Sequence, residues 1–217
     1  DTHKKEYAIQ FELGGKTCTV GAIGKGSGMI APNMATMLSV VLCDAQVEAS
    51  VWQKMLRDAV ELTFNRVTVD GDTSTNDTLY GLANGASGVS ASDEESLKAL
   101  SAALTSVLGD LAYMLVKDGE GASKVARIHV TGAASDADAE RVARTVGHSQ
   151  LVKTALYGRD ANWGRIVAAV GRSGADFNPD DVVVTLCGVE LFRKGQPTDL
   201  DFDALLQEPL KQRDLSI

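Results

Sequence analysis

The chain has 217 residues, of which 44% are hydrophobic and 23% are charged, and its formal net charge is -8. This composition is typical of a globular protein, and the length allows one large domain or two smaller ones. The acidic balance and the lack of a basic stripe in the sequence exclude nucleic acid as a partner. We also expect no membrane association, because no apolar run approaches the ~20 residues that span a bilayer.

The first forty residues predict a hairpin and then a buried strand. Residues 7–13 alternate between apolar and polar types, Gly14 and Gly15 make a turn, and residues 17–20 run back. A glycine-rich segment follows over residues 24–29, and residues 36–43 are almost wholly apolar. The last pattern is typical of a strand that is buried on both faces.

The rest of the chain alternates between helix and strand patterns. Apolar residues at helical spacing predict helices over 52–63, from the capping-box sequence 92–95 to residue 115, over 135–146 and over 163–170. Strands are expected over 124–131 and 181–188, with a second hairpin over 188–197. The fold class is therefore mixed α/β (α+β), with layered sheets flanked by helices. We place a domain boundary after residue 120, which gives a region 1–120 and a second α/β region 121–217.

The segment Lys25-Gly-Ser-Gly-Met-Ile-Ala-Pro-Asn-Met-Ala-Thr36-Met-Leu carries the clearest chemistry. A threonine hydroxyl becomes a useful nucleophile when a base takes its proton, and the threonine's own α-amino group can do so once the preceding bond is cut. That amine has an unperturbed pKa of about 7.7–8.0. The hydroxyl of Thr36 can first attack the carbonyl of Ala35, so the chain would cut itself. From composition alone, however, Thr36 is more simply a β-branched residue that starts a strand.

Four segments together resemble one family. The segment just given is similar to the self-cleavage segment of the glutamate N-acetyltransferase (ornithine acetyltransferase) family, which is cut between alanine and threonine. Residues 68–78 (TVDGDTSTNDT), 117–124 (KDGEGASK) and 158–164 (GRDANWG) resemble further signatures of that family in the same order. The resemblance implies the DmpA/ornithine-acetyltransferase-like fold.

The resemblance implies an activity and a set of site residues. Thr36 matches the nucleophile, and Ala35 and Thr36 match the cleavage site. Acetyl would pass from N2-acetylornithine to Thr36 and then to glutamate, with no metal and no cofactor, and acetyl-CoA is a second candidate donor. Lys25, Glu120 and Thr2 match substrate-binding positions. The implied assembly is a heterotetramer of two α and two β fragments.

Residues 73–78 offer many short hydrogen-bonding side chains, which either brace the amine of Thr36 or only cap a turn. We interpret them as structural support for the site. His129 and His148 receive no role, because the mechanism needs no imidazole. The three cysteines have no CxxC spacing, and we expect a reduced, cytoplasmic compartment.

Members of the family extend beyond both ends of this sequence. The preceding segment supplies a threonine-glycine oxyanion hole, and the following segment supplies substrate-binding residues. We therefore expect this sequence to be part of a longer precursor and, since an oxyanion donor contributes about 10²–10³ in rate, a poor enzyme by itself. Two alternatives stay open: a self-processing aminopeptidase of related mechanism, and an inactive fragment or scaffold.

Overall fold

The computed structural model describes residues 1–33 and 37–217. They form two compact units, Asp1–Ala122 and Ser123–Ile217. The sequence places a boundary after residue 120, and the division in the structure follows Ala122. Each unit has its own apolar core.

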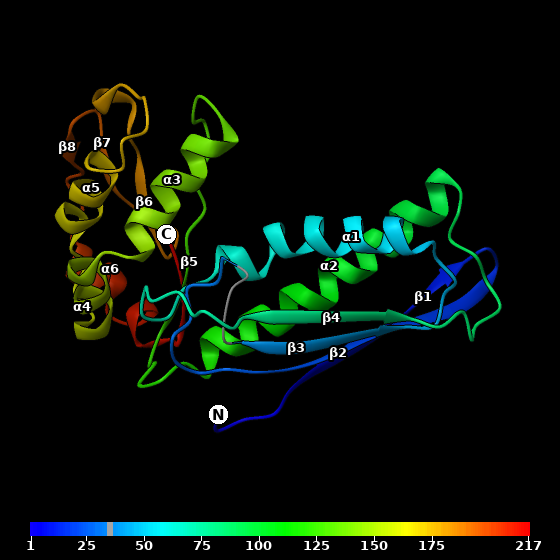
Figure 1. Cartoon of the computed structure of the whole chain (residues 1–217). Helices are drawn as coiled ribbons and strands as arrows, with labels where there is room; N and C mark the ends of the chain where they lie inside the picture. The colour runs from blue at the N-terminus through cyan, green and yellow to red at the C-terminus, as the bar shows by residue number, and fades with distance from the viewer. Residues whose placement is uncertain (34–36) are drawn as a thin grey trace. The chain divides into compact units, whose positions relative to one another are not determined.

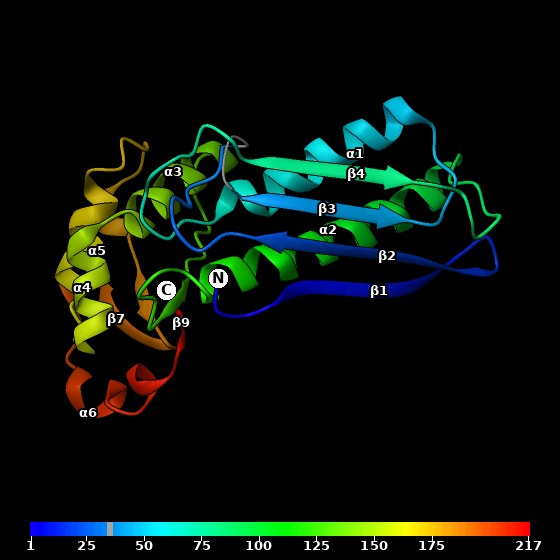
Figure 2. The same cartoon turned by 60° about the horizontal axis from the view of Figure 1, so that its bottom comes forward.

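The first unit is built on a four-stranded sheet in the order β1-β2-β3-β4 (Figures 1 and 2). Its first two strands form the expected antiparallel hairpin, and Gly14 and Gly15 turn the chain with φ of 57° and 74°. β3 pairs antiparallel with β2 and parallel with β4. The strands are β1 (Lys5–Leu13), β2 (Lys16–Lys25), β3 (Leu38–Cys43) and β4 (Thr78–Ala83).

Two helices cover one face of this sheet, α1 (Ala49–Leu62) and α2 (Glu94–Lys117), as Figure 2 shows. The short 3-10 helix η1 (Phe64–Arg66) follows α1. α2 packs along β1 and β2 and against α1, and its leucines meet the alternate strand residues that point inward. The opposite face carries exposed apolar side chains, including Leu38 at 47% and Leu42 at 56% exposed. Within this unit β3 is therefore buried on one face only, which corrects the expectation of burial on both.

α2 corrects the expectation that no apolar stretch of this chain approaches the length that spans a bilayer. Of the helices in the described residues, it is long and apolar enough to cross a bilayer by length and composition alone. Nine of its side chains are buried in the unit. A helix that forms the core of a sheet-based unit passes the same test, and the packing of α2 against β1 and β2 places it in that class.

The second unit combines four α-helices with two small sheets. β5 and β9 pair in parallel, and β6, β7 and β8 form an antiparallel sheet. Trp163 stacks on Phe192 at 5.4 Å between ring centroids and ties α5 to β7. The elements are β5 (Val125–Arg127), α3 (Asp136–Gly147), α4 (Gln150–Gly158), α5 (Trp163–Gly171), η2 (Pro179–Asp181), β6 (Val184–Leu186), β7 (Val189–Arg193), β8 (Gln196–Pro197), the one-turn helix α6 (Phe202–Leu206), η3 (Pro209–Lys211) and β9 (Asp214–Ser216).

The sequence patterns do not predict several of these elements, namely β4, α4, α6 and β9. β4 has only six residues and follows a run of turn-forming types, so its short alternation is a weak signal. The N-terminal cap of α2 lies one residue later than the sequence pattern predicts. The pattern places the capping box over residues 92–95, whereas in the structure Asp93 is the N-cap and exchanges hydrogen bonds with Ser96.

Candidate active site

The glycine-rich loop after β2 is held by the second signature segment. Asp70 accepts hydrogen bonds from the backbone N–H groups of Met29 at 2.7 Å and Ile30 at 3.1 Å. The backbone N–H of Val69 donates to the carbonyl of Ile30 at 2.6 Å. The hydroxyl of Thr73 donates to the carbonyl of Ala31 at 2.9 Å. Three consecutive residues of the loop, 29–31, are thus fixed by residues 69–73.

The same signature holds the chain again where it enters β3. Asp77 accepts a hydrogen bond from the backbone N–H of Met37 at 2.6 Å, and the N–H of Thr78 donates to the carbonyl of Met37 at 2.8 Å. The predicted cleavage site, Ala35 and Thr36, lies outside the described residues. The bonds of Asp70 and Asp77 therefore fix the chain on both sides of it, which supports a structural role for this signature.

Asp77 is unusual among these groups because its carboxylate is buried. Burial raises its pKa above the ordinary range for aspartate, while the hydrogen bond from Met37 and the positive charge of Lys25 act in the opposite direction. Its Oδ2 atom has no hydrogen-bond partner among the described residues. A buried carboxylate oxygen without a donor is costly, so this atom needs an explanation.

Lys25 and Glu120, both predicted to bind substrate, lie at the same loop. Lys25 is the last residue of β2, pairs with Leu38 and has an exposed side chain. The backbone N–H of Glu120 donates to the carbonyl of Ser27 at 2.8 Å. The Glu120 carboxylate lies against Gly28, where an added Cβ would come within 2.9 Å of its Cδ. Gly28 thus leaves room for the carboxylate beside the loop that begins at Lys25.

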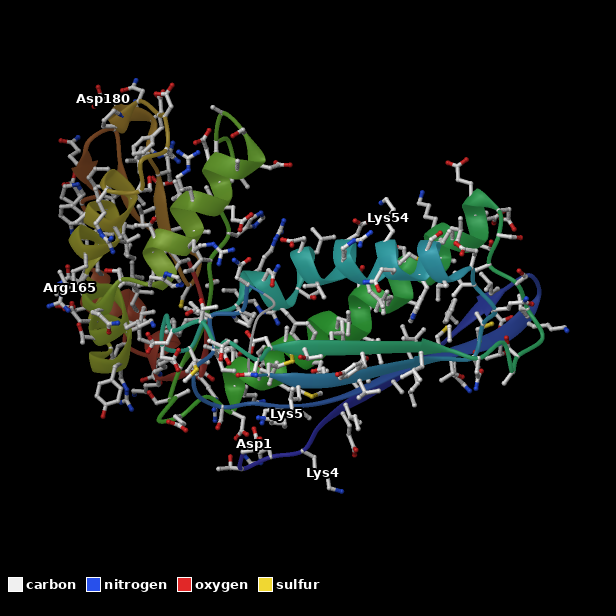
Figure 3. All side chains as sticks on the ribbon, viewed as in Figure 1. Asp1, Lys4, Lys5, Lys54, Arg165 and Asp180 are labelled. Atoms are coloured by element: carbon white, nitrogen blue, oxygen red, sulfur yellow. The ribbon has the colours of Figure 1, made fainter. Side chains whose placement is uncertain are left out.

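Thr2 is fixed beside this loop by a buried ion pair. Its N–H and hydroxyl both donate to Asp118, which also receives the ammonium of Lys5 at 2.5 Å. Asp1 accepts from Lys5 at 2.5 Å and from the N–H of Gly26 at 3.0 Å. Figure 3 shows Asp1 and Lys5 next to each other, with Lys4 directed away. The hydroxyl proton of Thr2 is committed to Asp118, so towards a substrate this oxygen can only accept.

Lys25, Glu120 and Thr2 therefore come together at one end of the sheet. The sequence reasoning missed the three carboxylates that organise this end, Asp70, Asp77 and Asp118. The first two stand inside the recognised signature 68–78, and the third lies two residues before Glu120. A signal was thus present in the motifs, but which carboxylate meets which backbone group depends on contacts between distant residues. Among residues 1–33 and 37–217, no group of three or more His, Cys, Asp or Glu side chains is arranged as a metal site.

The fourth signature, residues 158–164, lies in the second unit and shapes the connection between two helices. Arg159 caps α4 in the left-handed conformation, with φ of 57°. The side chain of Asn162 caps α5 by accepting from the N–H of Arg165 at 3.2 Å. Trp163 then packs on Phe192. Each of these contacts is structural.

Comparisons with known proteins identify the class. A model described as the ArgJ family matches residues 1–217, and the chain belongs to this family. It is 68% identical, over all of its length, to the arginine biosynthesis bifunctional protein ArgJ of Nitratidesulfovibrio vulgaris. It is 50% identical over 204 residues, 93% of its length and 39% of the relative's, to the chloroplastic ArgJ of Physcomitrium patens.

A solved structure is also similar. The crystal structure of the arginine biosynthesis bifunctional protein ArgJ from Bacillus halodurans matches 83% of this chain and 87% of its own, with a TM-score of 0.76 and 36% identity. The predicted family and the mixed α/β class are thereby confirmed. The chain spans 55% of the length of the Nitratidesulfovibrio relative.

Proposed function

We propose that the full-length parent of this chain is a glutamate N-acetyltransferase that moves acetyl from N2-acetylornithine to glutamate through an ester on Thr36. One observation carries the proposal. In a chain of this family, the self-cleavage segment is held on both sides of Ala35 and Thr36 by carboxylates of the second signature. Holding the flanking residues 29–31 and 37 reduces the conformational entropy that the chain must lose when a hydroxyl attacks a carbonyl between them.

The first event is self-cleavage. The hydroxyl of Thr36 attacks the carbonyl carbon of Ala35, the bond from that carbon to the Thr36 nitrogen breaks, and the nitrogen takes the hydroxyl proton. Water then hydrolyses the resulting ester and restores the hydroxyl. The products are a carboxylate on Ala35 and a free α-amino group on Thr36, which is the base for the next stage.

Acetyl transfer uses the same hydroxyl twice. The amine of Thr36 takes the hydroxyl proton as the oxygen attacks the acetyl carbonyl, and it returns a proton to the nitrogen of the leaving ornithine. The amino group of glutamate then attacks the acetyl ester, and the Thr36 oxygen leaves and regains its proton. An amide is exchanged for an amide, so the reaction needs no outside energy source, and we propose that it uses no metal and no cofactor.

Lys25, Glu120 and Thr2 supply the groups that an amino-acid substrate needs. The ammonium of Lys25 can bind a substrate carboxylate, and the carboxylate of Glu120 can bind a substrate ammonium. Thr2 offers a hydroxyl oxygen that accepts. Both substrates carry charges of both signs, which matches the charges placed at the loop 25–28 by β2 and by residue 120.

Replacing Gly28 by alanine should raise KM for the substrate by about 10-fold, since hydrogen bonds to charged groups contribute about 1.5–3 kcal/mol. The new Cβ would meet the Glu120 carboxylate at 2.9–3.1 Å and push it aside. Because Glu120 is exposed, the free energy of unfolding should change little. Steady-state kinetics of the full-length parent measures the effect. Gly171→Ala, where no atom lies within 4 Å of the added Cβ, is the matched control. An unchanged KM in Gly28→Ala would argue against Glu120 as a substrate ligand.

Intact-mass spectrometry of the purified full-length parent tests the proposed function. We expect two fragments separated between Ala35 and Thr36. Brief exposure to N2-acetylornithine should add about 42 Da to the fragment that begins with Thr36, as expected for an acetyl ester. Release of free amino acids from short peptides without acetyl transfer would indicate the aminopeptidase instead. A single uncut chain that gains no mass would indicate an inactive scaffold.

The proposal also covers the acetyl donor, the assembly and the location of the protein. Acetyl-CoA is a second candidate donor, because a thioester acylates a hydroxyl more readily than an amide does. We propose that the two fragments of each chain stay paired and form a heterotetramer of two α and two β fragments. We place the protein in the cytoplasm, while the relative from Physcomitrium patens is named as chloroplastic.

A further inference from the structure

Lys5 is a buried cation that the proposed mechanism does not use. It is the first residue of β1, it lies opposite Gly24 of β2, and its side chain is 1% exposed. The preceding residue, Lys4, is exposed and is directed away from the unit in Figure 3. Because burial removes an ammonium from water, a buried lysine is retained only where acceptors compensate for the lost hydration.

Two carboxylates share the Lys5 ammonium. Asp1 Oδ1 and Asp118 Oδ2 each lie 2.5 Å from its Nζ atom. These two oxygens are therefore at most about 5 Å apart, a distance at which two negative charges repel unless a cation lies between them. The Lys5 ammonium thus fixes the separation of two side chains that would otherwise move apart.

Asp1 connects this ammonium to the segment that carries Lys25. Its Oδ1 accepts from the N–H of Gly26 at 3.0 Å, and its Oδ2 lies 3.3 Å from the same nitrogen. The peptide group that Asp1 holds joins Gly26 to Lys25. The position of Asp1 therefore affects the point from which the Lys25 side chain begins.

Asp118 connects the ammonium to the other two candidate ligands. It accepts from the N–H of Thr2 at 2.9 Å and from the hydroxyl of Thr2. It also lies two residues before Glu120, whose N–H donates to the carbonyl of Ser27 at 2.8 Å. The segments 1–5, 25–28 and 118–120 are therefore joined to one another, and the Lys5 ammonium is the group that contacts both carboxylates.

We propose that Lys5 is a positioning residue whose buried ammonium holds Asp1 and Asp118 together and thereby sets the spacing of the three candidate substrate ligands. The inference rests on the proposed function, since these ligands matter only if an amino-acid substrate binds there. Stability alone does not account for the arrangement, because a buried ion pair is often no more stabilising than a pair of apolar residues. The self-cleavage segment is held separately, by Asp70 and Asp77, so Lys5 should affect substrate binding more than the chemical step.

The test is Lys5→Met in the full-length parent, with Lys4→Met as the matched control. Methionine is unbranched and of similar length but has no charge, so the two carboxylates should repel and the ligands should lose their spacing. We expect KM for N2-acetylornithine and for glutamate to rise about 10-fold, because charge-assisted hydrogen bonds to both substrates weaken. Self-cleavage should persist and kcat should stay within about twofold. Steady-state kinetics measures both constants, and Lys4→Met should change neither.

Two further variants separate positioning from stability. The double variant Lys5→Met with Asp118→Leu removes both buried charges, so its urea denaturation should be close to that of the wild type. Its KM should nevertheless stay raised, because no ion pair sets the spacing. Asp1→Ala removes the link to Gly26 at a side chain that is 34% exposed, so this variant should fold. We expect its KM to rise about 3-fold or more.

The outcomes distinguish the inference from the proposed function. A KM that returns to the wild-type value in the double variant, or that is unchanged in Asp1→Ala, would overturn the inference. A fall in kcat at unchanged KM in Lys5→Met would do so as well. If Lys5→Met does not fold, the other two variants decide. In each case a wild type that cleaves and becomes acetylated leaves the proposed function standing, whereas a wild type that never transfers acetyl would overturn both.

Discussion

Replacing Thr36 by alanine in the full-length parent should leave one uncut chain with no measurable acetyl transfer. Alanine has no hydroxyl, so it can neither attack the carbonyl of Ala35 nor carry the acetyl ester. Removing a covalent nucleophile costs on the order of 10⁶-fold in kcat when both half-reactions depend on it. Intact mass and a glutamate-dependent transfer assay measure both losses in one preparation. The described residues should fold as in the wild type, because Asp77 holds the backbone of Met37 and does not need the side chain before it.

Thr36→Ser is the matched variant for this prediction. Serine keeps the hydroxyl and, after cleavage, an α-amine in the same place, so it should cleave and transfer acetyl more slowly than the wild type. Its side chain lacks the β-methyl group that restricts χ1, which leaves the hydroxyl less firmly oriented. Cleavage or a gain of about 42 Da in Thr36→Ala would assign the nucleophile to another residue.

The local elements of this chain follow from its patterns, while the contacts between them do not. The patterns predict the β1–β2 hairpin and α2 because alternation, paired glycines and helical spacing act within a few residues. They do not predict β4, because its partner β3 lies about forty positions earlier and supplies its hydrogen bonds. Residue types near Thr78 give no hint of that pairing.

The candidate site likewise combines residues that the motifs predict with contacts that the motifs do not predict. The motifs name Lys25, Glu120 and Thr2, and the structure brings them to one loop although they lie far apart in the sequence. The motifs do not single out the carboxylates that fix them, since Asp70, Asp77 and Asp118 resemble ordinary turn or helix-end residues. Their roles come from burial and from backbone groups that only the fold delivers. Asp70 and Asp77 hold residues 29, 30 and 37, and Asp118 holds the segment that carries Thr2.

Replacing Asp118 by asparagine should lower the free energy of unfolding of the first unit by about 3 kcal/mol, because the buried Lys5 ammonium loses its buried carboxylate partner and keeps only the partly exposed carboxylate of Asp1. The side chains of Lys5 and Asp118 are 1% and 4% exposed. Urea denaturation of the full-length parent, followed by hydrogen exchange in β1 and α2, measures the change. Lys5, and then Thr2, hold the pKa of Asp118 well below its usual range. This stabilisation is therefore complete above the ordinary aspartate value of about 3.9 and is lost as the pH falls through the depressed pKa. The difference between variant and wild type should shrink in strong acid.

Two controls separate the loss of charge from a general effect of substitution. Asp58 pairs with Lys54 at the same 2.5 Å, but these side chains are 54% and 71% exposed, so Asp58→Asn should cost less than about 1 kcal/mol. The double variant Lys5→Met with Asp118→Leu should recover most of the stability, since it removes both buried charges. Asp1 still accepts from the N–H of Gly26 in that variant, so part of the link to the glycine-rich loop remains. If the double variant is as unstable as Asp118→Asn, the hydrogen bonds from Thr2 to Asp118 contribute more than the ion pair. The N-terminal segment would then be held mainly by the residue that the sequence predicts to bind substrate.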